Sequence, residues 1–402
     1  MSTFAAVMTG KGTAAISTIQ LFGDTAEAVI KKIFRPVGSK PAEYKTAKIL
    51  LGTIIDPSQQ ETIDQVTIGC EGHNNIAIHC HGNPLIVEMI MQLLQRNGVV
   101  LLTAEELLTK MLTAEKPEST IALEAKLAQL KAQTIEGARI IANQIENGLS
   151  KKATQWLQNI GAISLEEIVS EAEQILCDSR IARLIIEGCT AVLTGPPNTG
   201  KSTLLNCLAG RQKAIVSEIK GTTRDWVSAR CQIGPLSVEL IDTAGLDENR
   251  ESISPGAVAK AAQEKTVEIL DRADLILLVL DNSQPENPID GRLVKKITDK
   301  LVPSAVEGRI LTILNKSDLP ARFDAGKLPL ILGNIVSISA KFGTGIENLT
   351  QKILQICGVD GFDLQTAVFF TSRQENLLKQ LRISKSKKQA VSFITELLNG
   401  KV

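Results

Sequence analysis

The sequence predicts an α/β domain that is inserted in an α-helical domain and preceded by an α+β domain. Three observations support this architecture. Short apolar runs alternate with helical patterns from residue 190 to residue 356, apolar residues recur every three or four positions on both sides of that segment, and residues 1–115 mix strand-like runs with a helix. Near-continuous apolar strands between helices are typical of a mostly parallel sheet that is covered on both faces.

Composition limits the class of protein. The 402 residues suggest two or three domains, and 44% apolar with 22% charged residues is ordinary for a globular chain. Lys and Arg balance Asp and Glu at 44 each, so the overall charge demands neither nucleic acid nor an acidic membrane, although a local basic face is compatible with it. Aromatic residues make up only 3%, which argues against a surface that stacks single-stranded bases.

The seven cysteines are scattered along the chain without a CxxC pair. Such an unpatterned set, in a chain whose first residues lack a basic stretch followed by an apolar one, indicates a reduced and cytoplasmic protein. No uninterrupted apolar run approaches the ~20 residues that a membrane helix needs, so we expect no membrane partner.

Within residues 1–115, "AAISTIQL" and "NNIAIHCHG" are typical of strands, and "PLIVEMIMQLLQRNG" has helical spacing that ends at Asn97 and Gly98. All three histidines lie in one nine-residue window. On a strand, His79 and His81 would share a face, as a metal-binding pair could. We favour an ordinary strand and predict no metal there.

Helical patterns flank the predicted α/β domain. Residues 119–158 are rich in Ala, Leu, Lys, Glu and Gln at helical spacing and predict one or two long amphipathic helices. The pattern continues to about Ile186 and returns after Gly361. We therefore divide the chain into an α+β domain (1–115), a helical domain in two parts (116–186 and a shortened 359–402), and an α/β domain between them (187–358).

The stretch "GPPNTGKS", from Gly195 to Ser202, matches the phosphate-binding pattern GxxxxGK[ST]. It follows a predicted strand and opens a predicted helix, so its backbone N–H groups and the helix N-terminus can surround phosphate oxygens. Lys201 would reach the β- and γ-phosphates, and Ser202 would bind Mg²⁺. A chance glycine-rich turn is the alternative, which the strand–loop–helix context disfavours.

Three further motifs follow in order, each after a strand. "DTAG" supplies Asp242 for the Mg²⁺ shell and the Gly245 N–H for the γ-phosphate. "NKSD" supplies Asp318, whose carboxylate can accept hydrogen bonds from two N–H donors of guanine that adenine lacks. "SAK" supplies a backbone contact to guanine O6. The sequence therefore predicts binding of GTP and GDP. The predicted contacts are Gly195, Asn198, Thr199, Gly200, Lys201, Ser202, Thr203, Asp242, Gly245, Asn315, Lys316, Asp318, Ser339, Ala340 and Lys341.

The stretch "GTTRD", residues 221–225, lies between the phosphate loop and "DTAG". A threonine of a switch segment should close on Mg²⁺ there, and we choose Thr223 first and Thr222 second. Arg224 is either a catalytic finger or, as we favour, part of a salt bridge with Asp225 or another neighbour.

"GPPNTGKSTLLNCLAGRQKAIVSEIKGTTRD", followed by "LIDTAGL", resembles the tRNA-modification GTPase family MnmE, also called TrmE. "FAAVMTGKGTAAISTIQLFG" and "IAIHCHGNPLIVEMIMQLL" are similar to the family's N-terminal domain, and the long helices match its helical domain. The resemblance implies a homodimer through the N-terminal domain, which binds 5-formyltetrahydrofolate. It also implies an FAD-dependent partner protein with which the family modifies the wobble uridine of certain tRNAs.

The resemblance further implies a GTPase activated by K⁺ and by pairing of two GTPase domains. Leu246 stands where Ras-like GTPases place a water-orienting Gln, so charge stabilisation must come from elsewhere. Asn198 matches the family's cation-ligating Asn. With carbonyls around Ser217 and Ile219, and with Thr222, it would hold K⁺ against the phosphates and act in catalysis. A loop-stabilising amide is the alternative role of Asn198.

The chain departs from the family pattern in three places. Lining up on Gly256 puts Ile253 where the family has a catalytic Glu, and Glu251 is the nearest carboxylate that could take its role. "EELLTKMLTAEKPESTIALEA" lacks the Arg, Asn-Gly and Asp-Leu of a family stretch, and "LLNGKV" lacks the family's tail Cys. We expect tight GDP and GTP binding, slow hydrolysis, and weak or absent folate binding.

Together these observations predict an α/β P-loop GTPase domain inserted in an α-helical domain and preceded by an α+β N-terminal dimerisation domain. The leading function is that of a MnmE-like GTPase of tRNA wobble-uridine modification. The alternative is a divergent relative that is retained as a GTP-dependent switch or interaction protein without modification chemistry.

Overall fold

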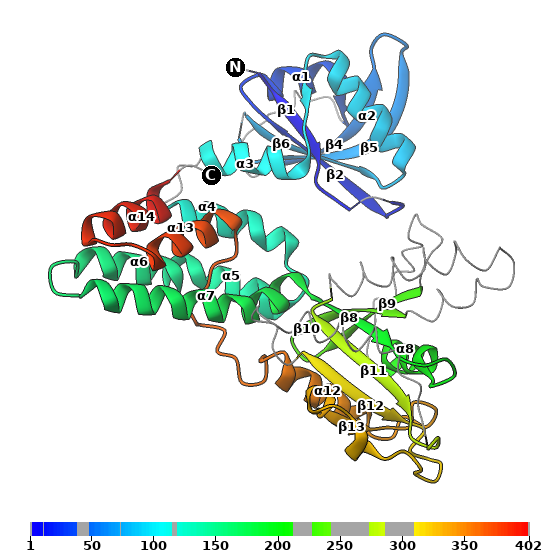
Figure 1. The fold of residues 1–402 in the computed structure, drawn as a ribbon. Helices are drawn as coiled ribbons and strands as arrows, with labels where there is room; N and C mark the ends of the chain where they lie inside the picture. The colour runs from blue at the N-terminus through cyan, green and yellow to red at the C-terminus, as the bar shows by residue number, and fades with distance from the viewer. Residues whose placement is uncertain are drawn as a thin grey trace, which may run out of the picture. The chain divides into compact units, whose positions relative to one another are not determined.

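The structure is a computed structural model that describes residues 2–10, 12–37, 48–72, 74–114, 119–211, 227–242, 273–285 and 309–400. The chain divides into two compact units, Met1–Glu118 and Ser119–Val402 (Figure 1). Each unit has a β-sheet of its own, and the two units are described separately below.

The first unit is built on a seven-stranded sheet with the order β3-β4-β5-β6-β2-β1-β7. All neighbouring strands are antiparallel except the pair β1 and β7. Buried and exposed side chains alternate along β2 because successive residues of a strand point to opposite faces. The strands are β1 (Phe4–Val7), β2 (Ile16–Phe22), β3 (Phe34–Pro36), β4 (Lys48–Asp56), β5 (Glu61–Cys70), β6 (Asn75–His81) and β7 (Val100–Leu101).

Three helices accompany this sheet: α1 (Ala26–Ile33), α2 (Pro84–Arg96) and α3 (Ala104–Ala114). Our prediction of a single helix in residues 1–115 is therefore wrong, whereas the end of α2 at Asn97 agrees with the sequence. The eight residues of α1 form barely two turns, too few for a 3.6-residue period to stand out. Apolar side chains of α1 and α2 share one core with the sheet.

His79 and His81 lie on β6 and project from the same face, but each ring has a different partner. His79 Nδ1 lies 2.9 Å from Thr18 Oγ1, and His81 Nδ1 lies 2.7 Å from Asp64 Oδ1. Asp64 also accepts a hydrogen bond from the His81 backbone N–H. The two rings are therefore anchored separately to the neighbouring strands β2 and β5.

The second unit begins with α4 (Thr120–Ala128), the 3-10 turn η1 (Gln129–Lys131), α5 (Ile135–Glu146), α6 (Leu149–Gln158) and α7 (Leu165–Glu187). Residues 119–158 thus form three short helices, not the one or two long ones that we predicted. Local caps explain the breaks, because Ser119 and Thr134 each accept a hydrogen bond from an N–H of the helix that follows. The spacing of apolar residues does not reveal such a break, because the helix that follows also buries an apolar face. None of the described helices has the length and apolarity of a membrane-spanning segment.

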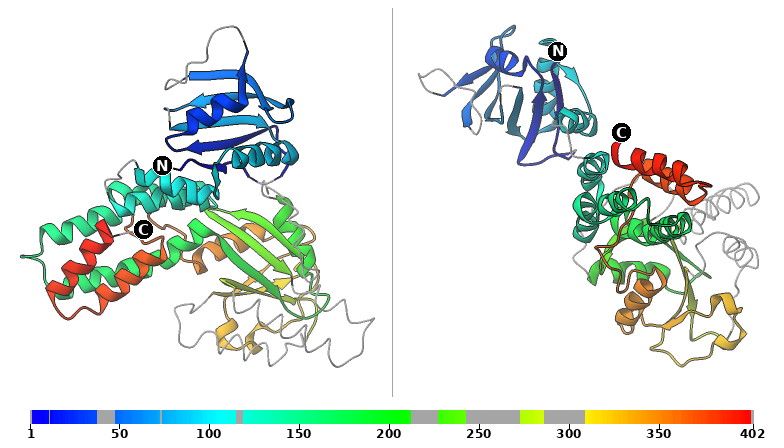
Figure 2. Two further views of the ribbon diagram at one scale, coloured as in Figure 1. Left: turned by 90° about the horizontal axis from the view of Figure 1, so that it is seen from above. Right: turned by 90° about the vertical axis from the view of Figure 1, so that its left-hand side faces the viewer.

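Two later helices, α13 (Ser372–Arg382) and α14 (Lys387–Asn399), pack against these helices, as both views in Figure 2 show. Glu124 of α4 is 4% exposed and accepts hydrogen bonds from Arg373, Gln374 and Thr371. Trp156 lies in the same core and is almost fully buried. Segments that are about 250 positions apart in the sequence therefore form one helical layer.

The segment before α13 forms neither a helix nor a strand, and side chains of α5 and α7 hold its backbone. Gln144, which is fully buried, accepts a hydrogen bond from Val368 N–H and donates one to the carbonyl of Thr366. Ser179 accepts a hydrogen bond from Phe369 N–H. These bonds satisfy backbone groups that no helix or sheet pairs.

The rest of the second unit is an α/β fold with the strand order β13-β12-β11-β8-β10-β9. Every neighbouring pair is parallel except β9 and β10, which confirms the predicted mostly parallel sheet. The strands are β8 (Cys189–Thr194), β9 (Val227–Ile233), β10 (Leu236–Asp242), β11 (Leu275–Asp281), β12 (Ile310–Asn315) and β13 (Ile335–Ser337), and the described helices are α8 (Lys201–Arg211) and α12 (Ile346–Ile356).

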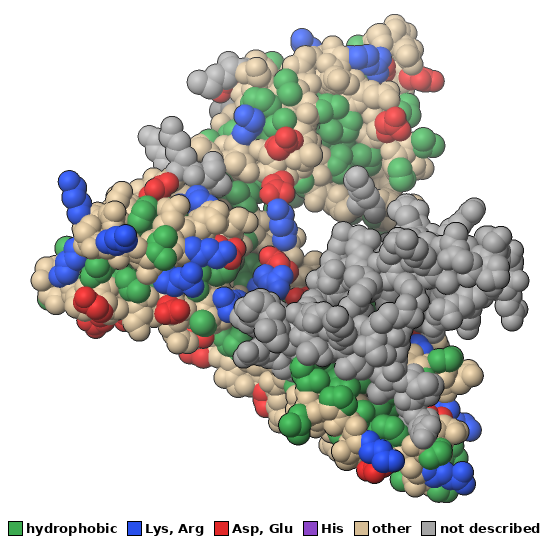
Figure 3. All heavy atoms as spheres, in the orientation of Figure 1, with side chains coloured by type: hydrophobic (Ala, Val, Ile, Leu, Met, Phe, Trp, Pro, Cys, Tyr) green, Lys and Arg blue, Asp and Glu red, His purple; other side chains and the backbone are tan. Residues whose placement is uncertain are grey.

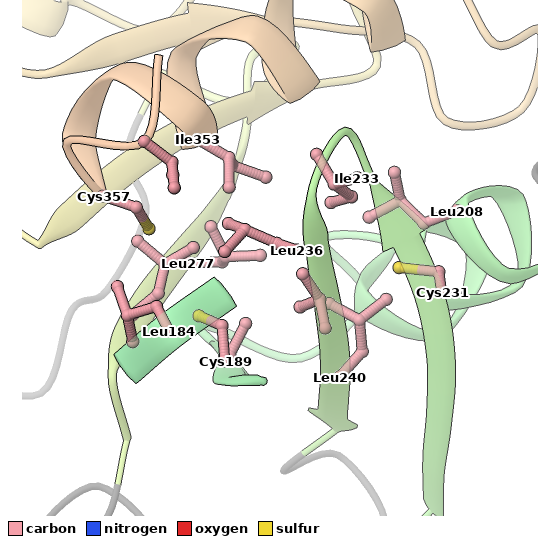
Figure 4. Packing of buried hydrophobic residues seen from close by; sticks show 14 of the residues in the cluster. Leu184, Cys189, Leu208, Cys231, Ile233, Leu236, Leu240, Leu277, Ile353 and Cys357 are labelled. Carbon is pink, nitrogen blue, oxygen red and sulfur yellow. The ribbon is translucent and has the colours of Figure 1, made fainter. Parts of the chain in front are cut away.

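Alternate residues of the sheet enter two different cores, as expected for strands covered on both faces. In the larger core, Leu184 of α7 and Ile353 of α12 pack with Leu277, which belongs to β11 of the sheet (Figure 4). A hydrogen bond with the Cys357 thiol and burial raise the pKa of the Cys189 thiol, so Cys189 stays protonated in this core. The helical layer and the α/β fold therefore share apolar side chains within the second unit.

Candidate nucleotide-binding site

The site lies at the carboxyl ends of the parallel strands. β8 ends at Thr194 and leads into the phosphate loop, β10 ends at Asp242, and β12 ends at Asn315. Ligands of open α/β sheets bind at this edge because the loops after the strands meet there.

The phosphate loop requires glycine at two positions. Gly195 has φ +138°, and a Cβ on it would stand 2.2 Å from the carbonyl oxygen of Val279. Gly200 has φ +92°, and a Cβ on it would stand 2.3 Å from Asn315 Nδ2. Asn198 also has a positive φ, +62°, a conformation that Asn tolerates better than most residues. The loop therefore lies close to β11 and to the end of β12.

Lys201, the first residue of α8, is 4% exposed. Its ammonium donates hydrogen bonds to the carbonyls of Gly195 and Pro196, both at 2.9 Å. The Thr199 hydroxyl donates to the same Pro196 carbonyl at 3.0 Å. The positive charge is thus held within the turn of the loop, beside the N-terminus of α8, where an anion is favoured.

Ser202 and Asp242 form the candidate metal site. The Ser202 hydroxyl donates a hydrogen bond to Asp242 Oδ2 at 2.6 Å, and Asp242 is 2% exposed. A hydroxyl and a carboxylate are hard oxygen donors, which suit Mg²⁺ better than softer metals. These two side chains therefore fit the predicted ion. Thr203 lies next on α8 and is exposed.

Asn315 connects the two halves of the site. It is 3% exposed, and its amide donates a hydrogen bond to the Thr199 carbonyl at 2.8 Å and accepts one from Ala340 N–H at 2.9 Å. The phosphate loop, the end of β12 and the loop after β13 are thereby held together by one side chain.

Lys316 has φ +64°, a strained conformation for a residue with a side chain. Its ammonium lies 2.7 Å from Asp281 Oδ2. Burial opposes ionisation of Asp281, but hydrogen bonds from Lys316 and Ser283 outweigh it and lower the pKa of the carboxyl group. Asp281 therefore remains charged and fixes the Lys316 side chain. Asp281 is not among the predicted residues, although the sequence carries a signal for it: an acidic residue that ends the apolar run "LILLVLD".

Asp318 is exposed, and its Oδ1 accepts a hydrogen bond from the Ser339 hydroxyl at 2.5 Å. Ser339 itself is 1% exposed, so the bond orients the carboxylate from a fixed side chain. Lys341 is exposed, and its ammonium lies 5.2 Å from the centroid of the Phe342 ring. Asp318, Ser339 and Lys341 thus lie on one loop cluster, as their motifs predict.

The structure brings together the described part of the predicted set at one sheet edge. Glu251, Gly245, the switch residues and the potassium residues other than Asn198 lie outside the described residues, so their placement stays a prediction. The predicted residues that are described are Gly195, Asn198, Thr199, Gly200, Lys201, Ser202, Thr203, Asp242, Asn315, Lys316, Asp318, Ser339, Ala340 and Lys341; those outside are Ser217, Ile219, Thr222, Thr223, Gly245 and Glu251, as are Arg224, Leu246 and Ile253.

The fold and the site define a P-loop GTPase. A family model described as 50S ribosome-binding GTPase matches residues 190–316, and one described as GTP-binding protein TrmE N-terminus matches residues 3–107. The chain belongs to the MnmE family of tRNA modification GTPases, and it is a GTP-hydrolysing enzyme.

The relatives are similar over most of their length. The tRNA modification GTPase MnmE of Heliobacterium modesticaldum is 30% identical over 396 residues, which cover 89% of this chain and 82% of the relative. The MnmE of Alkaliphilus oremlandii is 27% identical over 414 residues, which cover 94% and 87%, respectively. The MnmE of Lactiplantibacillus plantarum is 28% identical over 417 residues, with the same coverage of 94% and 87%.

Proposed function

We propose that this chain uses GTP hydrolysis in the modification of the wobble uridine of tRNA, together with an FAD-dependent partner protein. The observation that carries the GTPase part is the Asn315 amide, which joins the phosphate loop to the loop of Ala340. Similarity to MnmE proteins over 89% to 94% of the chain supports the tRNA part.

In the proposed site, Lys201 and the backbone of the loop after Gly195 bind the phosphates. Asp318 accepts the N1–H and N2–H₂ donors of guanine, and its bond from Ser339 supports this orientation. Ser202 and Asp242 would hold Mg²⁺, with Thr223 as a further ligand, and the bound ion would supply positive charge beside the phosphates. Gly245 contributes an N–H near the γ-phosphate.

For hydrolysis we propose that Asn198, with Ser217, Ile219 and Thr222, ligates K⁺. The position of Asn198 supports this role, because the residue is exposed and has a left-handed conformation within the phosphate loop. A fixed positive charge there would stabilise charge that develops on the transferred phosphate, a role that an arginine has in other GTPases. Glu251 is our candidate for the carboxylate that assists the attacking water.

At the level of domains, we propose that the GTPase domain (187–358) is inserted in a helical domain made of residues 116–186 and 359–402. The packing of α4 and α7 against α13 supports this division. Residues 1–115 would form the dimerisation domain, which the match to a TrmE N-terminal model supports. Binding of 5-formyltetrahydrofolate to this domain should be weak or absent, because the "EELLTKML" stretch departs from the family pattern.

The base specificity has a direct test. Asp318→Asn should replace the preference for guanine by a preference for xanthine, because the amide donates to the carbonyl oxygen that xanthine carries at position 2. Calorimetry with GDP, XDP and ADP on the parent and the variant measures this. Equal affinity of the parent for ADP and GDP would contradict the assignment.

A second experiment distinguishes the proposed function from its alternative, a GTP-dependent switch without modification chemistry. Ile253 in place of the family's Glu favours that alternative. The protein is combined with an FAD-dependent partner, tRNA, a formyl-folate and GTP, and the wobble uridine is analysed by mass spectrometry. Modified uridine supports the proposed function; bound and hydrolysed GTP without modified uridine supports the switch.

A further inference from the structure

Residues 379–388 carry five cations and no acidic residue, in a chain whose positive and negative charges balance overall. The five are Lys379, Arg382, Lys385, Lys387 and Lys388. They occupy the last turn of α13, the first turn of α14 and the connection between them. We call this surface the basic turn. Figure 3 shows Lys and Arg side chains on the exposed surface of the helical layer.

Hydrogen bonds hold the connection in one conformation. Ser386 caps α14 by accepting a hydrogen bond from Gln389 N–H, and the Gln389 side chain accepts one from Lys385 N–H. On the other side, the Ser384 hydroxyl donates to the Gln380 carbonyl. This reciprocal capping fixes the path of the chain, so the backbone of the basic turn is preorganised.

Few of these charges are neutralised within the protein. All five side chains are exposed. Lys379 pairs with Glu375 at 2.6 Å, and Lys387 donates to the Ile160 carbonyl at 3.0 Å. Arg382, Lys385 and Lys388 form no ion pair with any described carboxylate. Three guanidinium or ammonium groups are therefore available to an external anion.

The dipole of α14 adds to this positive potential. Lys387 and Lys388 lie in its first turn, which contains no acidic residue. Cations are unfavourable at the positive end of a helix dipole, and an anion bound beside them removes that cost. The repulsion between these cations and the helix dipole therefore destabilises the free protein, and binding of an anionic partner relieves it.

The character of the surface identifies that partner. Ile383 is the one large apolar side chain of the basic turn that is strongly exposed, at 69%, so there is no apolar stripe to enter a lipid layer. No aromatic residue lies in the segment to stack on a base. Exposed cations on a rigid turn instead suit the closely spaced phosphates of a folded RNA, which Lys and Arg contact without reading sequence.

We propose that the basic turn binds the sugar–phosphate backbone of tRNA. This inference rests on the proposed function, which makes tRNA the substrate, and it adds the surface that holds the tRNA. Contacts to phosphate position a nucleic acid and do not select its sequence. The basic turn would therefore bind different tRNAs alike, while selection of the wobble uridine would occur elsewhere.

The test removes the three unpaired cations together, as Arg382→Gln, Lys385→Gln and Lys388→Gln. Binding of fluorescently labelled, unmodified tRNA to the full chain is measured by anisotropy from 50 to 200 mM KCl. Loss of three phosphate contacts should weaken binding by about tenfold or more and reduce the slope of log affinity against log salt by about two to three.

A matched control carries Lys32→Gln, Lys131→Gln and Lys327→Gln, three exposed cations far apart in the sequence. It loses the same net charge, so it reports the effect of overall charge alone. Circular dichroism and the thermal midpoint verify that both variants are folded. The proposal requires that the basic-turn variant loses clearly more affinity and salt slope than the control.

Two results would overturn the inference, and they differ in meaning. If the parent binds tRNA and both variants lose affinity equally, the basic turn is not the docking surface, and the proposed function is unaffected. If the parent binds no tRNA even at 50 mM salt while it still binds GDP, the inference fails together with the tRNA part of the proposed function.

Discussion

Two residues of the nucleotide site, Asn198 and Lys316, have left-handed backbone conformations that cost energy in residues with side chains. Such strain persists only where surrounding contacts impose it. At Lys316 the contact is the ion pair with Asp281, which is 5% exposed.

Asp281→Asn should weaken GDP binding about tenfold, because a charged hydrogen bond contributes about 1.5–3 kcal/mol and its loss frees the Lys316 side chain. The pKa of Asp281 is lowered in the folded protein, so its ion pair is present above the ordinary pKa of about 4 and is lost only as the pH falls through the lower folded value. The difference between parent and variant should therefore be constant from about pH 5 to 8 in calorimetry.

Asp274→Asn is the matched control for Asp281→Asn. Asp274 precedes the same strand, β11, and pairs with Arg183 at the opposite sheet edge. Its substitution should leave the affinity for GDP unchanged. Equal weakening by the two substitutions would mean that Asp281 acts on general stability and does not position Lys316.

Asn198→Gly should remove any advantage of K⁺ over Na⁺ in GTP hydrolysis. Glycine keeps the positive φ without strain, so this substitution deletes the amide and preserves the path of the loop. The parent should hydrolyse GTP faster in K⁺, because Na⁺ is too small for the proposed ring of oxygen ligands. Phosphate release in matched K⁺ and Na⁺ buffers measures both rates.

Asn206→Ala, an exposed asparagine on α8, is the control for Asn198→Gly and should retain the dependence on K⁺. A parent enzyme whose rate is the same in both salts would exclude the potassium site. Loss of the K⁺ dependence in both variants would instead indicate an indirect effect on α8.

At the scale of elements, the helical layer depends on a polar cluster inside an apolar core. Glu124 of α4 accepts two hydrogen bonds from the Arg373 guanidinium and one each from Gln374 and Thr371 of the distant C-terminal segment. A buried carboxylate with this many partners is compensated, but removal of its charge leaves the guanidinium without a counter-ion in a site that is largely closed to water. The cluster therefore makes α4 and α13 mutually dependent.

Glu124→Gln should reduce the free energy of unfolding of the helical layer by about 2–4 kcal/mol. Trp156 reports on this layer, so urea unfolding is followed by its fluorescence in a Trp226→Phe background. Glu375→Gln, which breaks the exposed pair with Lys379, should cost less than about 0.5 kcal/mol. Similar losses of the free energy of unfolding for the two substitutions would show that burial of the Glu124 cluster does not add to stability.

At the scale of the whole molecule, the two compact units have separate sheets and separate cores. All described residues of the nucleotide site belong to the second unit, whereas the proposed dimerisation domain is the first. Association and nucleotide binding should therefore be independent reactions.

Light scattering at micromolar concentration should give about twice the monomer mass, and the mass should be the same with and without GDP. The proposed dimerisation domain, residues 1–115, lies outside the GTPase domain, so bound nucleotide makes no contact at that interface. A monomer under both conditions would exclude the N-terminal dimer, and a dimer formed only with GDP would place the interface in the GTPase domain.

The sequence alone determined the chemistry of the nucleotide site and the class of its sheet. The loop from Gly195 to Ser202 and the motifs after β10 and β12 are local, because each depends on a few adjacent residues and on the strand before them. Apolar runs of four to seven residues similarly reveal strands that are buried on both faces. These features needed no knowledge of distant contacts.

Only the tertiary structure decided how distant segments meet. The sequence did not reveal that Glu124 pairs with Arg373 or that Asp281 holds Lys316, because such pairs depend on the register in which helices and strands pack. The sequence also did not reveal the helix breaks at Thr134 and between α5 and α6. A cap depends on one or two residues, whereas the apolar periodicity continues across the break and hides it. Short-range patterns determine elements and motifs; packing across hundreds of residues determines which of their side chains act together.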